Sequence, residues 1–282
     1  MPYDAEISRN NPTCFLLMID QSGSMSDGFA GQTDRSKAQQ LADIINRLLA
    51  DICLRCVKNP SEGVRDYFYV GVIGYGRNDS AYPALAGPLA GQQLVRVSEL
   101  ANNPLRVEQR AIQVEDGAGG LMQRTVRFPI WFEPLADNGT PMCQAFQMAY
   151  DILQDWTKRY PRSFPPVVFN ITDGQPTDGD PLPDSQRLQQ LATSDGNVLV
   201  FNIHVSETAG QPLLYPERED LLPDDYARLL FRMSSVLPPH LVTFLREEGF
   251  TITPQSRGFV FNANAVEVIR FLNIGTRPKN LR

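Results

Sequence analysis

The chain has 282 residues, 42% of them hydrophobic, and this predicts a globular protein with a substantial buried core. Its 26 basic and 32 acidic residues give a formal net charge of −6, and no lysine- or arginine-rich run could form a phosphate-binding stripe. Nucleic acid is therefore not expected as a partner. No segment approaches the roughly 18 to 20 apolar residues that cross a bilayer, and the apolar run after Thr13 is too short for a signal-peptide core. We expect no membrane partner and a cytoplasmic location.

The first elements alternate between strand and helix. Residues 13–20 (TCFLLMID) form an almost wholly apolar run that ends in a polar turn, which is typical of a parallel strand covered on both faces. Apolar residues then recur at helical spacing over 36–57, and Thr33 or Asp34 could cap this amphipathic helix. Residues 67–75 (YFYVGVIGY), rich in aromatic and β-branched side chains, predict a second strand.

The pattern is less regular over residues 77–132, which we interpret as an insertion of edge strands. Its clearest feature is an antiparallel hairpin of residues 107–114 and 122–132 around the glycine-rich turn 116–120. Apolar side chains of the second strand fall on one face at period two. The hairpin therefore has one face to bury, either as a flap that extends the sheet edge or as a border of the functional site.

Regular alternation returns after the insertion. Helices are expected over 141–158, 185–192, 226–247 (one helix or a pair, broken by Pro238-Pro239) and 265–274, and strands over 167–172, 198–205 and 259–261. We see no linker and no repeat, and residues 275–282 form a C-terminal tail. The order predicts one α/β domain over residues 1–282, with a doubly wound, mainly parallel, Rossmann-like central sheet and helices on both faces.

Three polar loops in this plan follow a strand or lead into a helix. The first reads DQSGSM from Asp20, the second DNGTP with Thr140, and the third TDGQPTD with Asp173. Ligands in doubly wound sheets sit at the carboxyl ends of the strands, so these loops should meet. Two carboxylates and three hydroxyls, without His or Cys, are the hard oxygen donors that suit a small divalent cation such as Mg²⁺ or Mn²⁺ rather than Zn²⁺.

These motifs together resemble a known family. Asp-x-Ser-x-Ser after an apolar strand, a later Gly-Thr-Pro and a later strand ending in Thr-Asp-Gly are similar to the metal-ion-dependent adhesion site of von Willebrand factor A (vWA), or integrin I-type, domains. The resemblance implies that Ser22, Ser24 and Thr140 coordinate the metal through hydroxyls, and that Asp20 and Asp173 act directly or through bound water. It extends over nearly the whole chain, and the loop from Thr172 to Asp178 looks most like intracellular bacterial vWA proteins of the tellurium-resistance-associated type.

The resemblance implies a binding module rather than an enzyme. The metal would recognise a protein partner that supplies an Asp or Glu to it. Members of the intracellular group work beside enzymes encoded elsewhere, so an AAA+ ATPase, a kinase or a phosphatase of a bacterial stress or conflict system is the expected kind of partner. This chain departs from the family in its long insertion before the Thr140 loop.

A Mg²⁺-dependent phosphotransfer enzyme with Asp20 as nucleophile is the main alternative. Such phosphatases carry a second carboxylate two residues later, where this chain has Ser22, so no general acid or base is in place. A Ser-His-Asp hydrolase needs a positioned histidine, and His204 and His240 both occur in contexts typical of structural residues.

Several residues near the motifs have a simpler interpretation. Asp27, Asp178 and Asp180 lie close to the loops, but solvated or supporting carboxylates are the expected roles. Cys53 and Cys56 have the spacing of half a zinc site, although a second pair is missing, so buried thiols are expected at all four cysteines.

Overall fold

A computed structural model describes residues 3–29, 32–59, 61–115, 120–206 and 210–276. Its centre is a mainly parallel sheet with the strand order β13-β14-β12-β9-β1-β4-β5. The parallel strands are β1 (Thr13–Asp20), β4 (Phe68–Tyr75), β9 (Val167–Thr172), β12 (Leu199–Val205) and β14 (Phe259–Ala263). The antiparallel edges are β13 (Leu213–Leu214) on β14, and β5 (Ala81–Pro83) and β6 (Val95–Arg96) on β4.

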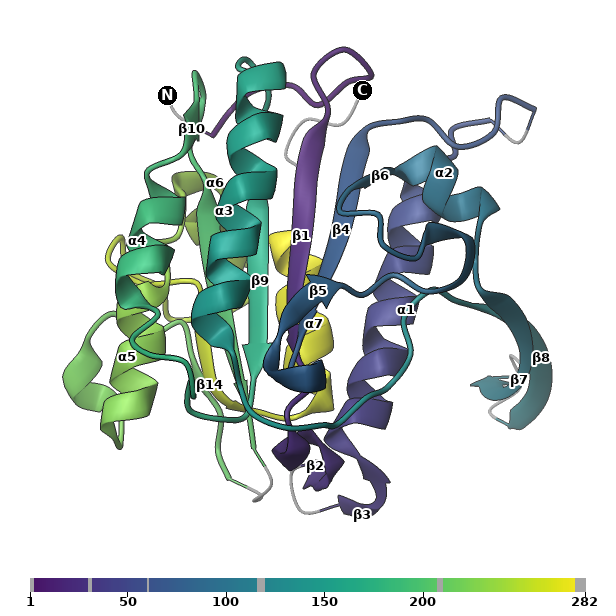
Figure 1. Ribbon diagram of the computed structural model, residues 1–282. Helices are drawn as coiled ribbons and strands as arrows, with labels where there is room; N and C mark the ends of the chain where they lie inside the picture. Colours follow the sequence, from purple (N-terminus) through teal and green to yellow (C-terminus); the bar gives the residue numbers. More distant parts are fainter. Residues whose placement is uncertain (1–2, 30–31, 60, 116–119, 207–209, 277–282) are drawn as a thin grey trace.

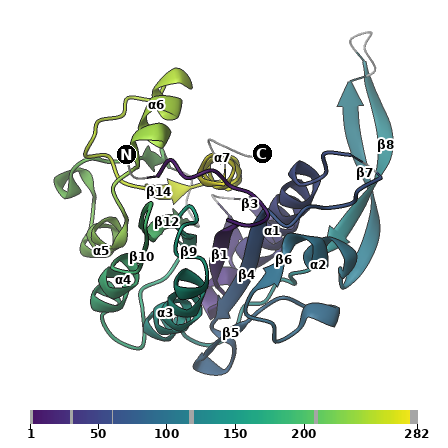
Figure 2. The same cartoon turned by 90° about the horizontal axis from the view of Figure 1, so that it is seen from above.

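Helices cover both faces of this sheet (Figure 1; Figure 2). One face carries α1 (Lys37–Arg55), α6 (Pro239–Glu247) and α7 (Ala265–Gly275), and the other carries α3 (Met142–Arg159), α4 (Leu182–Gln189) and α5 (Asp225–Met233). A short helix, α2 (Val97–Asn102), follows β6. The remaining short elements are η1 (Gly23–Ser26), β2 (Gly28–Phe29), β3 (Gln32–Ser36), η2 (Arg77–Asp79), η3 (Gly87–Leu89), β10 (Ala192–Thr193), β11 (Gly196–Asn197) and η4 (Glu219–Leu221).

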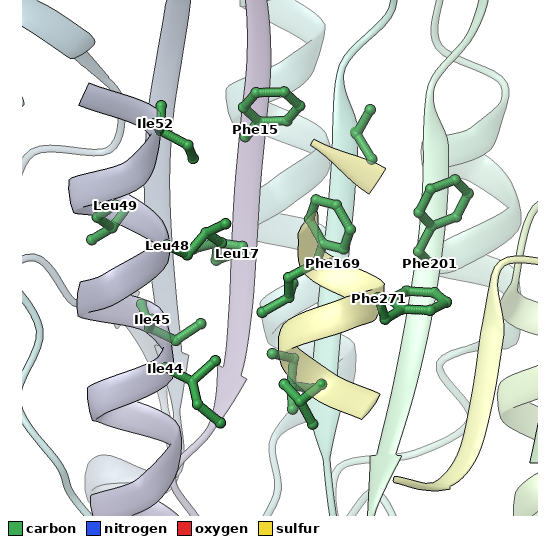
Figure 3. Packing of buried hydrophobic residues seen from close by; sticks show 14 of the residues in the cluster. Phe15, Leu17, Ile44, Ile45, Leu48, Leu49, Ile52, Phe169, Phe201 and Phe271 are labelled. Carbon is green, nitrogen blue, oxygen red and sulfur yellow. The ribbon is translucent and has the colours of Figure 1, made fainter. Parts of the chain in front are cut away.

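The core explains why the central strands are mostly apolar. Successive side chains of β1 point to opposite faces, so Phe15 and Leu17 pack with α1 and α7, while Leu16 and Met18 pack with α3. Figure 3 shows the first of these layers, where aromatic rings of β9, β12 and α7 meet beside the leucine and isoleucine stripe of α1. A strand buried on both faces needs apolar residues at nearly every position, and β1 is buried from end to end with polar residues only at its two ends.

Three sequence-based boundaries move. The first helix begins at Lys37 rather than 36, and its cap is Ser36 instead of Thr33 or Asp34: the Ser36 side chain accepts from the Gln39 backbone, and the Gln39 side chain accepts from the Ser36 backbone. α4 begins at Leu182, three residues before the expected start, because proline is tolerated in a first helical turn. The expected region 226–247 is a pair, of which the first helix ends at Met233 and the second begins at Pro239.

The expectation that the hairpin extends the sheet edge is wrong. β7 (Arg106–Glu115) and β8 (Leu121–Ile130) pair with each other in a sheet of their own, while the antiparallel edge beside β4 is formed by β5 and β6. Buried Asn46 on α1 directs the chain away from that edge, because its side chain binds the backbone of Trp131 and Phe132. The hairpin therefore lies over α1, and Figure 2 shows it projecting from the body of the domain. Its expected turn, residues 116–120, and the expected tail fall largely outside the described residues.

Candidate metal centre

The expected site lies where the strand order reverses. From β1 the chain continues to β4 on one side of β1 and later returns to β9 on the other side. Loops after β1 and β9 consequently leave toward opposite faces, and the gap between their carboxyl ends is the position where open α/β sheets bind ligands. Asp20 ends β1, and Asp173 directly follows β9. The carboxyl ends of β1 and β9 lie at the lower end of the sheet in Figure 1.

Asp20 is buried and held at both oxygens. Its Oδ1 accepts from the Ser22 backbone N–H at 2.9 Å, and its Oδ2 accepts from the Thr172 hydroxyl at 2.7 Å. The pKa of Asp20 is raised to about 6: burial is the largest cause, the negative charge of Asp173 adds to the rise, and the hydrogen bonds from Ser22 and Thr172 oppose it. The two carboxylates therefore repel one another within one buried space.

Asp173 connects the third loop to the first loop and to α1. Its Oδ1 accepts from the Ser24 hydroxyl at 2.8 Å, and its Oδ2 lies 2.5 Å from Lys37 Nζ. Both side chains of this ion pair are 1% exposed. The contact with Lys37 is an ion pair rather than a hydrogen bond of regular geometry, and Oδ2 has no such hydrogen bond among the described residues.

Three hydroxyls from two separate loops meet beside Gly174. A methyl group placed on its Cα would lie 3.3 Å from Thr140 Oγ1, 3.6 Å from Ser24 Oγ and 3.9 Å from Ser22 Oγ. The hydroxyls of Ser22 and Ser24 are themselves 3.1 Å apart. All five residues expected at the site are thus brought to one small space, and glycine at 174 leaves that space open.

Backbone contacts fix the second loop against the first. The Gly23 N–H donates to Asn138 O at 2.9 Å, and the Asp137 N–H donates to Gln21 O at 2.7 Å. On the other side, Thr140 exchanges hydrogen bonds with Thr177: Thr140 N–H donates to its hydroxyl, and Thr177 N–H donates to Thr140 O. The Thr140 hydroxyl is therefore positioned by both neighbouring loops.

Close approach of the chain to the first loop also requires a glycine. Gly76 follows β4 with φ +144°, and a Cβ there would lie 2.5 Å from the backbone carbonyl of Gln21. Beside it, the Asp79 side chain accepts from the Gly139 N–H at 2.8 Å. The turn after β4 thus supports two of the three site loops.

The donor set fits a hard divalent cation. Two neighbouring carboxylates, with three hydroxyls beside them, form an oxygen-rich pocket in which a cation would relieve the repulsion that raises the pKa of Asp20. Within the described ranges, no group of three or more His, Cys, Asp or Glu side chains is placed so that it could hold a metal ion. The site described above contains two such side chains and therefore depends on its hydroxyls.

Two contributors to the site, Lys37 and Thr172, were missed by sequence reasoning. Lys37 lies 17 residues after Asp20 on α1, and nothing in the local sequence indicates that a lysine there is fully buried. Thr172 was read as a strand residue, yet its hydroxyl also lies 3.1 Å from Tyr226 OH. The signal that could have found Thr172 is its place before Asp173, where its side chain shares the carboxyl edge of the sheet with Asp20.

The neighbouring carboxylates have structural roles. Asp178 accepts from the backbone N–H groups of Cys143 and Gln144 at the start of α3, where a negative charge also suits the helix dipole. Asp180 caps the start of α4 through Leu182 N–H. Asp27 is exposed.

The histidines and cysteines are placed in the packing. His204 stacks on Phe261, its Nδ1 accepts from the Asn262 N–H, and burial lowers its pKa to about 4. His240 lies edge-on to Phe164, near the amino end of β1. All four cysteines are buried and free, as expected for structural thiols.

Comparison with known proteins identifies no family. No family model and no curated protein matches the chain. Among solved structures it is similar to the PilB minor pilin from Streptococcus sanguinis, with 11% identity and a TM-score of 0.33 over 58% of this chain and 30% of that one. It is also similar to the pilus adhesin RrgA from Streptococcus pneumoniae, with 15% identity and a TM-score of 0.30 over 61% of this chain and 22% of that one. The chain thus spans less than a third of either, and TM-scores this low establish no common fold. No helix among the described residues has the length and apolar character needed to cross a membrane.

Proposed function

We propose that this protein is a vWA-type binding module that recognises a partner carboxylate through a divalent cation, Mg²⁺ or Mn²⁺, and that it has no catalytic activity of its own. The observation that carries the proposal is the convergence of the Ser22, Ser24 and Thr140 hydroxyls with the Asp20 and Asp173 carboxylates. The three loops lie at the switch point of a mainly parallel sheet, which is where such folds bind ligands.

Each residue has a distinct part in this proposal. The three hydroxyls are neutral oxygen donors that would hold the ion, while Asp20 and Asp173 supply the negative charge, directly or through water. A bound divalent ion would offer an open position to an anionic oxygen. Because the donors come from separate loops, an incoming ligand can change the position of Thr140 relative to Asp20. The partner is therefore expected to contribute Asp or Glu.

The wider setting follows from the motif resemblance alone. A bacterial cytoplasmic stress or conflict system, with an AAA+ ATPase, kinase or phosphatase as partner, belongs to this proposal and awaits identification of the bound protein. Titration calorimetry of that partner with and without EDTA is the direct measurement. Equal affinity in both conditions would place recognition on another surface.

Metal binding itself can be tested on the isolated protein. Mg²⁺ and Mn²⁺ should raise the melting temperature, because a ligand that binds the native state stabilises it. Asp20→Ala should abolish the shift, while Asp27→Ala, which removes the same charge from an exposed position near the site, should retain it. A metal-dependent shift that survives Asp20→Ala would place the metal elsewhere.

The phosphotransfer alternative makes an opposite prediction. Such enzymes carry their general acid or base two residues after the nucleophile, and here that residue is Ser22, whose hydroxyl contacts Ser24. We expect no turnover of p-nitrophenyl phosphate with Mg²⁺ present. Turnover that disappears in Asp20→Asn but survives in Thr140→Ala would favour the phosphatase.

A further inference from the structure

Lys37 is a fully buried cation inside the proposed metal site. It is the first residue of α1, where Ser36 caps the helix and the Lys37 N–H donates to Asp27 O at 2.8 Å. Its side chain runs inward, so that Nζ lies 2.5 Å from Asp173 Oδ2. A buried ammonium and carboxylate are stable together only as a pair, because each is costly to desolvate alone.

The lysine changes the charge of the site. Asp20 and Asp173 together carry two negative charges when ionised, and Lys37 reduces the total to one. A divalent ion added to this site leaves one net positive charge, whereas the same five donors without Lys37 would be neutral. Lys37 therefore opposes binding of the metal and leaves the loaded site in need of one further negative charge.

We propose that Lys37 is a specificity-determining residue: an internal counter-cation that shares Asp173 with the metal, weakens metal binding, and makes the loaded site select a singly charged carboxylate over a neutral oxygen ligand. The inference rests on the proposed metal-dependent function and adds the charge of the ligand to it. Lys37 also gives Asp173 a positively charged partner in the metal-free protein. Without this lysine, the two neighbouring carboxylates would have no such cation beside them among the described residues.

The experiment compares Lys37→Met with Lys158→Met. Lys158 is 67% exposed near the end of α3, so the control removes the same charge far from the site. Calorimetric titration with Mg²⁺ should give an affinity about tenfold or more higher in Lys37→Met than in the wild type, and an unchanged affinity in Lys158→Met. Acetate binding to the Mn²⁺-loaded proteins, followed by water proton relaxation, should weaken in Lys37→Met alone, with acetamide as the neutral comparison.

The outcomes separate this inference from the proposed function. If the wild type binds Mg²⁺ and Lys37→Met binds it no more tightly, the role of Lys37 is overturned while the metal site stands. If Lys37→Met binds Mg²⁺ and the wild type does not, Lys37 is the resident cation, and metal-dependent recognition by the natural protein is overturned. Absence of binding in both overturns both. Should Lys37→Met fail to fold without metal, Lys37→Gln, whose amide can still donate to Asp173, provides the same charge comparison.

Discussion

Charged side chains are buried at the loop edge, the carboxyl end of the sheet that holds the candidate metal centre, but are partly exposed in the hairpin of β7 and β8. At the loop edge, Lys37 and Asp173 are each 1% exposed. In the hairpin, Arg110 pairs with Asp43 of α1, and these side chains are 33% and 28% exposed. The same pairing chemistry therefore has different consequences, because water screens the second pair and is excluded from the first. We therefore expect the functional site at the buried charge pair. The partly exposed pair belongs to a surface on which charged residues can be replaced at little cost in stability.

The largest expected effect comes from breaking the buried pair. In metal-free buffer, Asp173→Ala should lower the free energy of unfolding by roughly 3 to 5 kcal/mol, because it leaves the Lys37 ammonium buried without this carboxylate. Asp43→Ala removes a carboxylate that contacts both Arg35 and Arg110, yet it should cost only about 0 to 1 kcal/mol. Urea denaturation of both variants measures the difference. Equal losses would mean that burial does not separate the two regions.

The next largest effect is a pH-dependent gain in stability in the variant Asp20→Asn. The pKa of Asp20 is raised to about 6 in the folded protein, so its ionisation destabilises the metal-free fold at neutral pH. The cost is absent below the ordinary pKa near 4, grows as the pH rises from about 4 to about 6, and is nearly complete at pH 7. Asp20→Asn should therefore stabilise the metal-free protein by about 3 kcal/mol at pH 7 and by little at pH 4.

Unfolding measurements on both proteins across this pH range test that prediction. The pKa of His204 is lowered to about 4, so acidification destabilises the fold through this residue, whereas it stabilises the fold through Asp20. Because His204 is present in both proteins, its effect cancels in the difference between their stabilities. A stability difference that does not change between pH 4 and pH 7 would show that Asp20 does not titrate in this range.

The smallest effect on stability is expected in the hairpin. Replacing residues 113–124 with a short glycine turn keeps the Arg110–Asp43 pair and the Asn46 contacts at the hairpin base, so the free energy of unfolding should change by less than about 1 kcal/mol. Mg²⁺ affinity should also stay the same. We expect partner affinity to fall, because the hairpin lies over the helix that begins at Lys37.

Asn46→Ala is the matched contrast for the hairpin. It leaves the Trp131 and Phe132 N–H groups without their acceptor, and each buried unsatisfied group costs roughly 1 to 3 kcal/mol. The pair of variants separates the anchored base from the projecting strands. A truncated protein that folds and binds its partner as tightly as before would make the hairpin a structural addition only.

Much of the fold was predictable because it depends on local patterns. The apolar run of residues 13–20 and the helical stripe after Ser36 predicted a buried parallel strand and a crossover helix, and both are present within two residues of their expected bounds. The hairpin strands were predicted as well. Their position was not, since alternation indicates that one face is buried but says nothing about which element covers it.

The candidate site divides in the same way. The sequence alone determined which candidate oxygen donors the site contains and their order along the chain, because Asp20, Ser22 and Ser24 lie on alternate residues of one turn, Thr140 lies just before a helix and Asp173 directly follows a strand. Tertiary structure alone decided that Lys37 enters the site from α1 and that Thr172 holds Asp20. The reason is physical: donors within a loop are positioned by the local backbone, whereas a side chain that arrives from another element depends on how helix and sheet pack together, which no short stretch of sequence specifies.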